Sequence, residues 1–579
     1  MSDEESWIAN GLFPGNFSLL YPPGKEMKAK KDEGAIDIAA QHDLGIDTIA
    51  AAFTANIEKQ KEIYPTLCRL IQDPEVIRYR QDVLEDLLAH PNLVERLESL
   101  FPVIDSLVQY AYRREYGADS LQEVIWRMGE LQNVLDCIQG LDDNFTSLDE
   151  VLHSKGLRLL REKVHAARND PTVRHLAQEL PEILTTLRAC VSISIGVNLD
   201  SSLRPVQAVL LAVHDKPFTD QSLLNRLFGF QKDQAGIAPL HSVPPREVQG
   251  HYAFPIDPEL GWAVEPMMVP LFADLSKILK KTTEPIAKRL RQYTEVQGGM
   301  FIPLRGDLMF YLGAARFIKS LQQRGLGVCR PEIAPVEERL CWARDSYNAN
   351  LALRDTTKGR ELPGGVITND VGMGPEGRIL ILTGPNQGGK TTYMQGIGLV
   401  QLLAQIGCFV PGTQAKISPV DQILTHFPLE EQPEADTGRF GEEALRLGKI
   451  FERVSRNSLV LLNESLSSTS SGESLYLAQD VVRILRRLGA RVIYSTHMHE
   501  LAGRVDELND CVEGDSKIVS IVSSPVDADP QTPDVEIQRS YKVEARPPLG
   551  QSYAREIARR YGISYEQLEK KLKFRKVDR

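Results

Sequence analysis

The feature that most constrains the fold of this 579-residue chain is one glycine-rich stretch, which reads Gly-x-x-x-x-Gly-Lys-Thr. It follows the apolar residues 379–382 and precedes a helical pattern over 391–406. The glycines let backbone N–H groups close around phosphate oxygens, and the start of a following helix adds partial positive charge. The stretch therefore predicts a strand–loop–helix unit that binds a nucleotide through its phosphates. The predicted contact residues are Gly384, Pro385, Asn386, Gln387, Gly388, Gly389, Lys390, Thr391 and Thr392.

The motif also assigns chemical roles to particular side chains. Lys390 is expected to reach the β- and γ-phosphates, and the Thr391 hydroxyl to bind Mg²⁺. Hydrolysis needs in addition a metal-orienting acid and a group that positions water, and Asn463 and Glu464 end a second apolar run. Glu464 is the predicted general base. Asn463 stands where an aspartate would hold Mg²⁺ through water, and its uncharged amide predicts weaker metal binding or slower turnover. The alternative for this pair is a helix-capping turn.

A third apolar run, over 490–495, is followed by His497. At the end of a strand beside the nucleotide, this histidine is predicted to sense the γ-phosphate or to orient water. A purely structural histidine is the alternative. A metal site made with His499 and Glu500 is a weaker interpretation, because no further spaced ligands accompany them.

The rest of the chain divides by its pattern. After about residue 330, short apolar runs alternate with helical segments, which predicts a mostly parallel sheet covered on both faces. Residues 45–188 repeat apolar positions at steps of three and four, which predicts long packed helices, and 191–213 predicts an inserted β-hairpin. The expected domains are a loosely ordered leader (1–43), a helical domain (44–328), an α/β domain (329–545) and a C-terminal helical element (546–579).

Composition excludes several classes of protein. With 67 Lys and Arg against 78 Asp and Glu, the net charge of −11 rules out a uniformly basic nucleic-acid-coating protein, so phosphate-backbone contact must come from a local patch. The seven cysteines form no CxxC pair, and no signal peptide or membrane-length apolar run is present. We therefore expect a cytoplasmic protein, free to associate with the nucleoid, and no membrane contact.

Two helical stretches, 155–168 and 277–291, are locally basic. Solvated helix faces are the ordinary explanation of such runs. The functional interpretation is a cationic lining on helical arms that hold DNA through its backbone. The predicted contact residues are Lys277, Lys280, Lys281, Lys288, Arg289 and Arg291.

Taken together and in this order, these segments resemble the ATPase of the MutS family of DNA mismatch-repair and junction-binding proteins, which is related to ABC ATPases. The similar segments are 383–394, 403–411, 458–464, 495–501 and 550–558, and the helical part over 44–323 resembles the family's lever and core region. The resemblance implies ATP and Mg²⁺ as cofactors, DNA as a partner and a homodimer. It implies that Glu464 supports hydrolysis, that His497 is the switch histidine, and that Ile367 and Asn369 frame the adenine.

In the family, a signature segment of a second subunit completes each site. Here it resembles Thr437, Gly438, Arg439 and Phe440, but Gly438 and Arg439 replace a Ser-Thr pair, and residues 466–468 replace a Gly-Arg-Gly run. Only about 40 residues precede the helical region, and neither Phe13 nor Phe17 begins the Phe-x-Glu wedge of mismatch-recognising members. We therefore expect no mismatch recognition of that kind, and the C-terminal helix predicts no added nuclease domain.

Three hypotheses about function remain open at this point. The leading one is a homodimeric ATPase in which ATP controls clamping on branched or other non-standard DNA. The second is a slow or non-hydrolysing nucleotide-gated scaffold that acts through a protein partner. The third keeps the ATPase and replaces DNA by structured RNA or a ribosome.

Overall fold

The structure is a computed structural model, and it divides into two compact units. Unit 1 comprises Met1–Ser18 and His90–Leu308, and unit 2 comprises Leu19–Ala89 and Met309–Arg579. The predicted boundary at 328/329 thus differs from the observed one, which lies inside a single helix, α12 (Ile302–Gln323). The described residues are 17–25, 34–112, 121–146, 148, 151–188, 192–202, 205–214, 216, 219–220, 235–236, 285–294, 296–354, 365–385, 387–428, 439–525, 539–548 and 562–577.

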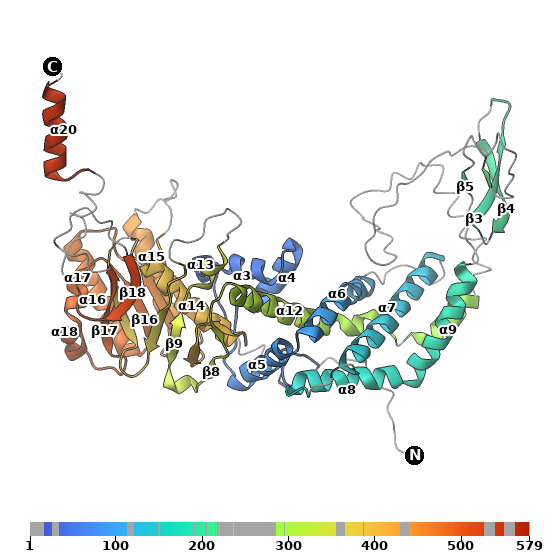
Figure 1. Ribbon diagram of the computed structural model, residues 1–579, viewed down its shortest axis with the longest axis horizontal. Coiled ribbons are helices and arrows are strands. Elements are labelled where there is room, and N and C mark those ends of the chain that lie inside the picture. Colours follow the sequence, from blue (N-terminus) through green and yellow to red (C-terminus); the bar gives the residue numbers. More distant parts are fainter. Residues whose placement is uncertain are drawn as a thin grey trace, which may run out of the picture. The chain divides into compact units, whose positions relative to one another are not determined.

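A six-stranded sheet forms the centre of unit 2 (Figure 1). Its strands, in spatial order, are β14 (Ile423–His426), β15 (Leu459–Asn463), β16 (Arg491–Ser495), β11 (Ile379–Thr383), β17 (Ile518–Pro525) and β18 (Arg539–Ala545). All neighbours are parallel except β18, which pairs antiparallel with β17. The three apolar runs of the sequence are β11, β15 and β16, and every residue in them is buried. The predicted parallel sheet is therefore present, with the glycine-rich stretch at the end of an inner strand.

Helices cover both faces of this sheet (Figure 1). On one face, Ile379 and Ile381 of β11 join an apolar core with side chains of α15 (Arg439–Arg453), α16 (Ser471–Leu488), α17 (His499–Gly503) and α18 (Val505–Cys511). On the other face, α14 (Lys390–Gln405) packs on β15 and β16. Gly398 of α14 permits this close approach, since a Cβ there would lie 3.0 Å from Leu461 Cδ1. Because both faces are covered, the central strands are fully buried and mostly apolar, and their polar residues stand at the strand ends.

A smaller four-stranded sheet stands beside the main one in unit 2. Its order is β10 (Asn369–Met373), β9 (Cys341–Ser346), β13 (Gln414–Ile417) and β8 (Glu332–Ile333), and a separate short pair joins β12 (Val410–Pro411) to β7 (Val328–Cys329). Strand β10 lies at one edge, where the side chain of Asn369 hydrogen bonds to the backbone of β18. These hydrogen bonds join β10, the strand that precedes β11 in the chain, to β18, the last strand of the main sheet.

The prediction of a loosely ordered leader over 1–43 is wrong for the described residues 17–25 and 34–43. Strand β1 (Gly34–Ala35) pairs with β2 (Arg69–Leu70), and α2 (Ile38–Leu44) begins at an N-cap that Asp37 provides. Leu19 and Tyr21 are buried, and the Arg80 guanidinium lies 4.9 Å from the Tyr21 ring. Arg80 also donates to the carbonyl oxygens of Leu20 (2.9 Å) and Ile406 (3.2 Å). Two-residue strands and a seven-residue helix offer too little periodicity for detection in the sequence.

Further helices belong to this part of unit 2, and their bounds are α3 (Ile46–Phe53), α4 (Ile57–Leu67), α5 (Pro74–Ala89) and α13 (Ala349–Leu353). Helix α3 packs on α4 and on α13, and α2 packs on both α14 and β14. Phe53 of α3 contacts Phe310 and Phe317 of α12, with ring centroids about 6 Å apart. The residues before α5 are thus an integral layer of the α/β unit.

Unit 1 consists mainly of long helices, as the periodicity predicts. These are α6 (Pro91–Tyr112), α7 (Leu121–Thr146), α8 (Lys155–Asn169) and α9 (Pro171–Arg188), and each packs on the next. Leu131, Leu160 and Leu176 are fully buried between them. After α9, β3 (Ser192–Leu199) pairs antiparallel with β4 (Pro205–His214) around the turn at Asp200. Among the described helices, none is both long and apolar enough to cross a membrane.

Candidate nucleotide-binding site

The glycine-rich loop connects β11 directly to α14. Gly384 has φ 148° and Gly389 has φ 86°, conformations that residues with a Cβ rarely adopt. A Cβ on Gly388 would lie 2.8 Å from the Pro385 carbonyl oxygen, so this glycine is required for space as well. Asn386, one of the nine predicted phosphate contacts, lies outside the described residues. The described glycines therefore permit the tight loop that the motif predicts at the start of α14.

Lys390 is the first residue of α14, and its side chain turns back into the loop. It is 5% exposed, and its Nζ donates to the carbonyl oxygens of Gly384 and Pro385 at 3.1 Å each. Its positive charge lowers the pKa of two groups beyond the loop, Glu464 and His499, although it is not the main cause for either. A buried ammonium within a loop at a helix N-terminus is suited to bind an anion of high charge.

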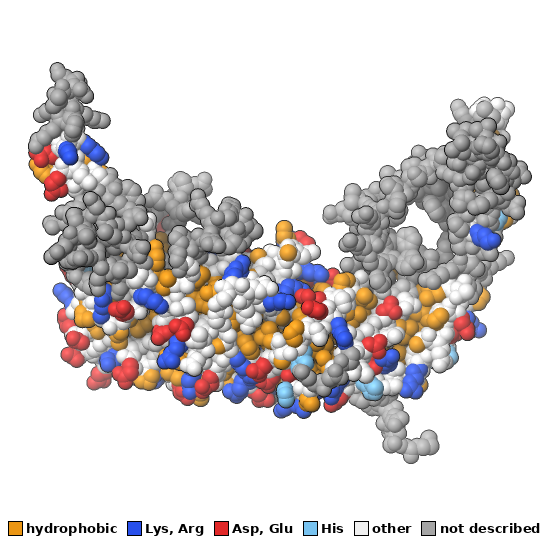
Figure 2. All heavy atoms as spheres, viewed as in Figure 1, with side chains coloured by type: hydrophobic (Ala, Val, Ile, Leu, Met, Phe, Trp, Pro, Cys, Tyr) orange, Lys and Arg blue, Asp and Glu red, His pale blue; other side chains and the backbone are white. Residues whose placement is uncertain are grey.

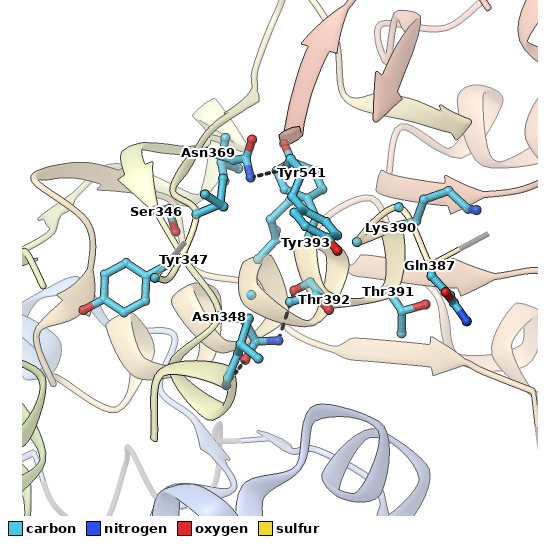
Figure 3. Close-up of a pocket in the computed structure, with 18 of the residues that line it drawn as sticks. Ser346, Tyr347, Asn348, Asn369, Gln387, Lys390, Thr391, Thr392, Tyr393 and Tyr541 are labelled. Atoms are coloured by element: carbon cyan, nitrogen blue, oxygen red, sulfur yellow. Dashed lines mark hydrogen bonds between the residues drawn. The ribbon is translucent and has the colours of Figure 1, made fainter. Parts of the chain in front are cut away.

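A cavity of about 960 Å³ opens beside this loop (Figure 3). The loop residues from Gln387 to Thr392 line this cavity, and so do Ile367 and Asn369, so the predicted phosphate and adenine segments share one cavity. Glu464 also lines it. This volume is at the upper end of the range typical of small-molecule sites, large enough for a nucleoside triphosphate.

Tyr541 of β18 is a cavity residue that the sequence did not reveal. It is 43% exposed, has φ 52°, and its ring carbon Cδ1 lies 3.2 Å from where a Cβ on Gly389 would be. Asn369 donates through Nδ2 to the Tyr541 carbonyl oxygen at 3.0 Å (Figure 3). It also accepts through Oδ1 from the Val543 N–H at 2.8 Å. Asn369 therefore holds Tyr541 at the cavity. The aromatic ring offers an apolar surface to a planar base.

Thr391, which lines the cavity, lies next to Asn463. The Thr391 Oγ1 lies 3.3 Å from Asn463 Nδ2 and 3.5 Å from Asn463 Oδ1, and Asn463 is 6% exposed. A hydroxyl and an amide oxygen are hard oxygen ligands of the kind that Mg²⁺ takes, so this pair fits the predicted metal position. Neither side chain carries a charge. The structure thus places the two predicted metal residues together.

Glu464 and His497 also lie together. Glu464 Oε1 accepts a hydrogen bond from His497 Nε2 at 2.7 Å, and this bond is the main cause that holds the pKa of the Glu464 carboxyl below its ordinary value. Because a carboxylate can only accept, Nε2 carries the proton. The Glu464 backbone has φ 51° and its N–H donates to the Ser495 carbonyl oxygen (2.8 Å). Helix α16 begins only at Ser471, so the helix-capping alternative for Asn463 and Glu464 is wrong.

Of the four residues of the signature-like segment, the structure describes two. Thr437 and Gly438 lie outside the described residues, whereas Arg439 begins α15 and Phe440, in its first turn, is 37% exposed. The signature-like segment thus leads into a helix. The weak metal interpretation of His497, His499 and Glu500 gains no support, because no described group of three or more His, Cys, Asp or Glu side chains could hold a metal ion.

Among the predicted DNA contacts, Lys277, Lys280 and Lys281 lie outside the described residues, and Lys288 and Arg291 are exposed. Arg289 has an acidic partner, since its Nε donates to Glu179 Oε1 at 2.5 Å. Glu179 lies on α9, 110 residues earlier, and a local charge pattern cannot reveal such a pair.

These features define a class of protein. A parallel sheet in which one strand runs through a glycine-rich loop into a helix, with a buried lysine in the loop, is a P-loop nucleotide-binding domain. Glu464 and His497 follow the next two strands of the same sheet, β15 and β16.

Comparison with known proteins narrows the class to a family. The MutS domain V family matches residues 380–566, and the MutS2 N-terminal domain family matches residues 72–324. The chain belongs to the MutS family.

Several proteins named DNA mismatch repair protein MutS are similar to this chain. The one from Methanothrix thermoacetophila is 24% identical over 458 residues, which are 75% of this chain and 50% of the relative. The one from Brevibacillus brevis is 40% identical over 148 residues (25% of this chain, 17% of the relative), and that from Bacillus subtilis is 36% identical over 143 (24% and 17%). The chain therefore spans about half the length of the first relative and about a sixth of the other two.

Proposed function

We propose that this protein binds and hydrolyses ATP, and that the nucleotide controls its clamping on DNA of branched or other non-standard structure. The observation that carries the enzymatic part is that Lys390 and Glu464 line one cavity, with the Glu464 carboxylate held by His497. An ionised base, a phosphate-binding ammonium and a cavity of nucleotide size are the parts that phosphoryl transfer to water requires.

Each residue has a defined part in this reaction. The loop N–H groups and Lys390 bind the β- and γ-phosphates, and the Tyr541 ring contacts the base. Thr391 and Asn463 would hold Mg²⁺, which balances phosphate charge when bound. Glu464 orients the water whose oxygen attacks the γ-phosphorus and accepts its proton, while the bond to the β-phosphate oxygen breaks. His497 keeps the carboxylate facing the cavity.

The change Glu464→Gln tests this proposal. It keeps the shape of the side chain and removes the base, so we expect turnover to fall roughly 10²–10⁴-fold while ATP binding is retained. Phosphate release and binding of a fluorescent ATP analogue would be measured side by side. The exposed Glu452 on α15, changed to Gln, is the matched control and should behave as the original protein. Undiminished hydrolysis in Glu464→Gln would remove Glu464 from the mechanism.

The DNA part of the proposal is supported by family membership and by surface charge. Lys155, Arg158 and Arg161 of α8 are exposed, and Lys288 and Arg291 are exposed in the same unit. A homodimer is supported by the exposure of Phe440 at the start of α15, where the signature-like segment would meet a second subunit. Light scattering with and without ATP would test the dimer.

A second candidate function is the slow or non-hydrolysing nucleotide-gated scaffold. The neutral Asn463 beside Thr391 favours it, because an amide binds a metal less strongly than a carboxylate. Steady phosphate release that DNA stimulates would exclude it. Competition between duplex, four-way junction and structured RNA would separate the DNA proposal from the RNA-associated one.

A further inference from the structure

The turn that follows Glu464 has an unusual backbone. Glu464 has φ 51° and Leu466 has φ 65°, so two residues with side chains adopt the left-handed conformation within three positions. Such conformations are uncommon outside glycine and persist where the surroundings hold them in place. The direction in which the Glu464 side chain leaves the strand therefore depends on what holds residues 464–468.

Two buried side chains of the sheet hold the middle of this turn. Tyr494 of β16 donates from its hydroxyl to the Ser465 carbonyl oxygen at 2.7 Å, and His426 of β14 has its Nδ1 2.7 Å from Ser465 Oγ. The Nε2 of His426 lies 3.3 Å from the backbone carbonyl oxygen of Glu443, which can only accept. Nε2 therefore donates, and Nδ1 accepts from the Ser465 hydroxyl. Burial lowers the pKa of His426, in agreement with this neutral form.

The third contact comes from a helix. The Glu443 carboxylate accepts from the backbone N–H of Leu466 at 2.8 Å and from the hydroxyl of Ser468. Both of its oxygens are thus bonded to the turn. Glu443 belongs to α15, which begins at Arg439, immediately after the signature-like Thr437 and Gly438. Of these three contacts, it is the one that joins the turn to α15 directly, whereas His426 joins them indirectly, through Ser465 and the Glu443 carbonyl oxygen.

We propose that Glu443 is a positioning residue, which fixes the turn after Glu464 and couples the orientation of that catalytic carboxylate to the start of α15. The proposal rests on the proposed ATPase function and deepens it. Whatever contacts the exposed Phe440 would shift the first turn of α15, and Glu443 would carry this shift to Leu466 and Ser468. A second copy of this chain, bound through its nucleotide, is the partner that would make such contact.

The first test is kinetic, with the full-length protein. Glu443→Ala removes both bonds, and because a misplacement of about 1 Å can cost about 10²-fold in rate, we expect kcat to fall by about that factor. ATP binding should stay near its original strength, because Glu443 does not line the cavity. Glu443→Gln should retain most of the turnover, since its amide oxygen can accept from Leu466 and its amide N–H can donate to Ser468. Glu452→Ala, on the exposed side of α15, is the control.

The second test does not depend on hydrolysis. Hydrogen exchange of the Leu466 amide should be faster in Glu443→Ala than in the original protein and in Glu452→Ala, while exchange in β15 stays the same. Ser468→Ala should give a smaller loss of kcat, and adding it to Glu443→Ala should cost little more, as expected for residues that share a bond. If the original protein does not hydrolyse ATP, the ATPase proposal fails, and the hydrogen-exchange result still decides the role of Glu443. Unchanged Leu466 exchange, or unchanged kcat in an active protein, would overturn the role of Glu443.

Discussion

At the scale of single residues, side-chain chemistry decides how strongly the site can work. For Asn463 the sequence predicts the position, because the residue ends an apolar run beside the predicted base, and weaker metal binding or slower turnover remains a prediction. The structure adds its contact with Thr391, 3.3–3.5 Å away. A neutral amide at this position would bind a divalent cation less strongly than a carboxylate.

The change Asn463→Asp should therefore strengthen metal binding. We expect the Mg²⁺ concentration for half-maximal ATP hydrolysis to fall by roughly threefold to tenfold, the equivalent of about 0.7–1.4 kcal/mol. Magnesium titrations of phosphate release would measure this. Asn92→Asp, at an exposed position of α6, controls for the added charge. An unchanged titration curve would place the metal away from residue 463.

A second residue, Asp515, determines how stability depends on pH. Its carboxylate accepts from Arg339 (3.1 Å at the longer contact) and from Arg456, and Arg378 donates to its backbone carbonyl oxygen. Hydrogen bonding from Arg339 is the main cause that lowers the pKa of Asp515 below its ordinary value of 3.8. Since the folded pKa is the lower one, the ionised form stabilises the fold above pH 3.8, and this contribution is lost as the pH falls further.

We therefore expect Asp515→Asn to lower the melting temperature at pH 7, because three guanidinium groups then lose their common anion. The difference from the original protein should narrow as the pH is lowered toward and below 4, where the carboxylate itself becomes protonated. Thermal unfolding measured across this range, with the exposed Asp510→Asn as control, would show it. A difference that stays constant with pH would contradict the role of the charge.

At the scale of elements, what the sequence predicted follows from how each element is buried. Strands β11, β15 and β16 are covered on both faces, so their residues are all buried and mostly apolar, which makes these strands easy to recognise in the sequence. The two-residue β1 and the seven-residue α2 carry no comparable pattern, although they belong to the same unit and Leu44 of α2 is fully buried.

The residues of the candidate site also fall into two groups, those that the sequence could predict and those that it could not. The positions of Lys390, Glu464 and His497 could be predicted because each belongs to a motif that begins at the end of an apolar strand. Those of Tyr541 and Glu443 could not, since each residue reaches the site from a strand or helix far from the motif, and only tertiary packing brings them there.

Helix α14 allows a test of how closely these elements pack. A Cβ on Gly398 would lie 2.5 Å from Leu44 Cδ2 and 3.0 Å from Leu461 Cδ1. Gly398→Ala should therefore destabilise the protein by about 1–3 kcal/mol, as overpacking commonly does. In contrast, a Cβ on Gly448 of α15 would have nothing within 4 Å, and Gly448→Ala should stabilise by about 0.5–1 kcal/mol. Urea unfolding of both variants would measure the two effects; equal effects would contradict the packing described.

At the scale of the whole molecule, the net charge of −11 must be reconciled with nucleic-acid binding. Figure 2 shows acidic and basic side chains interspersed over the face that it draws, without one dominant sign. Binding to a phosphate backbone must then come from local groups of basic residues.

We expect the combined change of Lys277, Lys280, Lys281 and Lys288 to Glu to weaken DNA binding and to flatten its salt dependence. Arg289 is left in place, because its bond to Glu179 makes it a poor choice for charge reversal. Binding to a four-way junction at several salt concentrations would be compared with Lys319→Glu, an exposed lysine of α12. Unchanged affinity and slope would move the contact to other residues, with the exposed face of α8 as the next to test.

The early chain segments of unit 2 bear on how the protein is made. Gln405, at the end of α14, donates to the carbonyl oxygen of Ile71, a residue 334 positions earlier. At a synthesis rate of about 5–20 residues per second, the ribosome needs roughly 15–70 s between these two residues. For much of this delay, buried side chains such as Ile49 and Phe53 lack partners from the second half of the chain, while the helices α6 to α9 of unit 1 emerge. In a nascent chain of this design, apolar side chains that the folded unit buries therefore wait for their packing partners until the second half of the chain arrives.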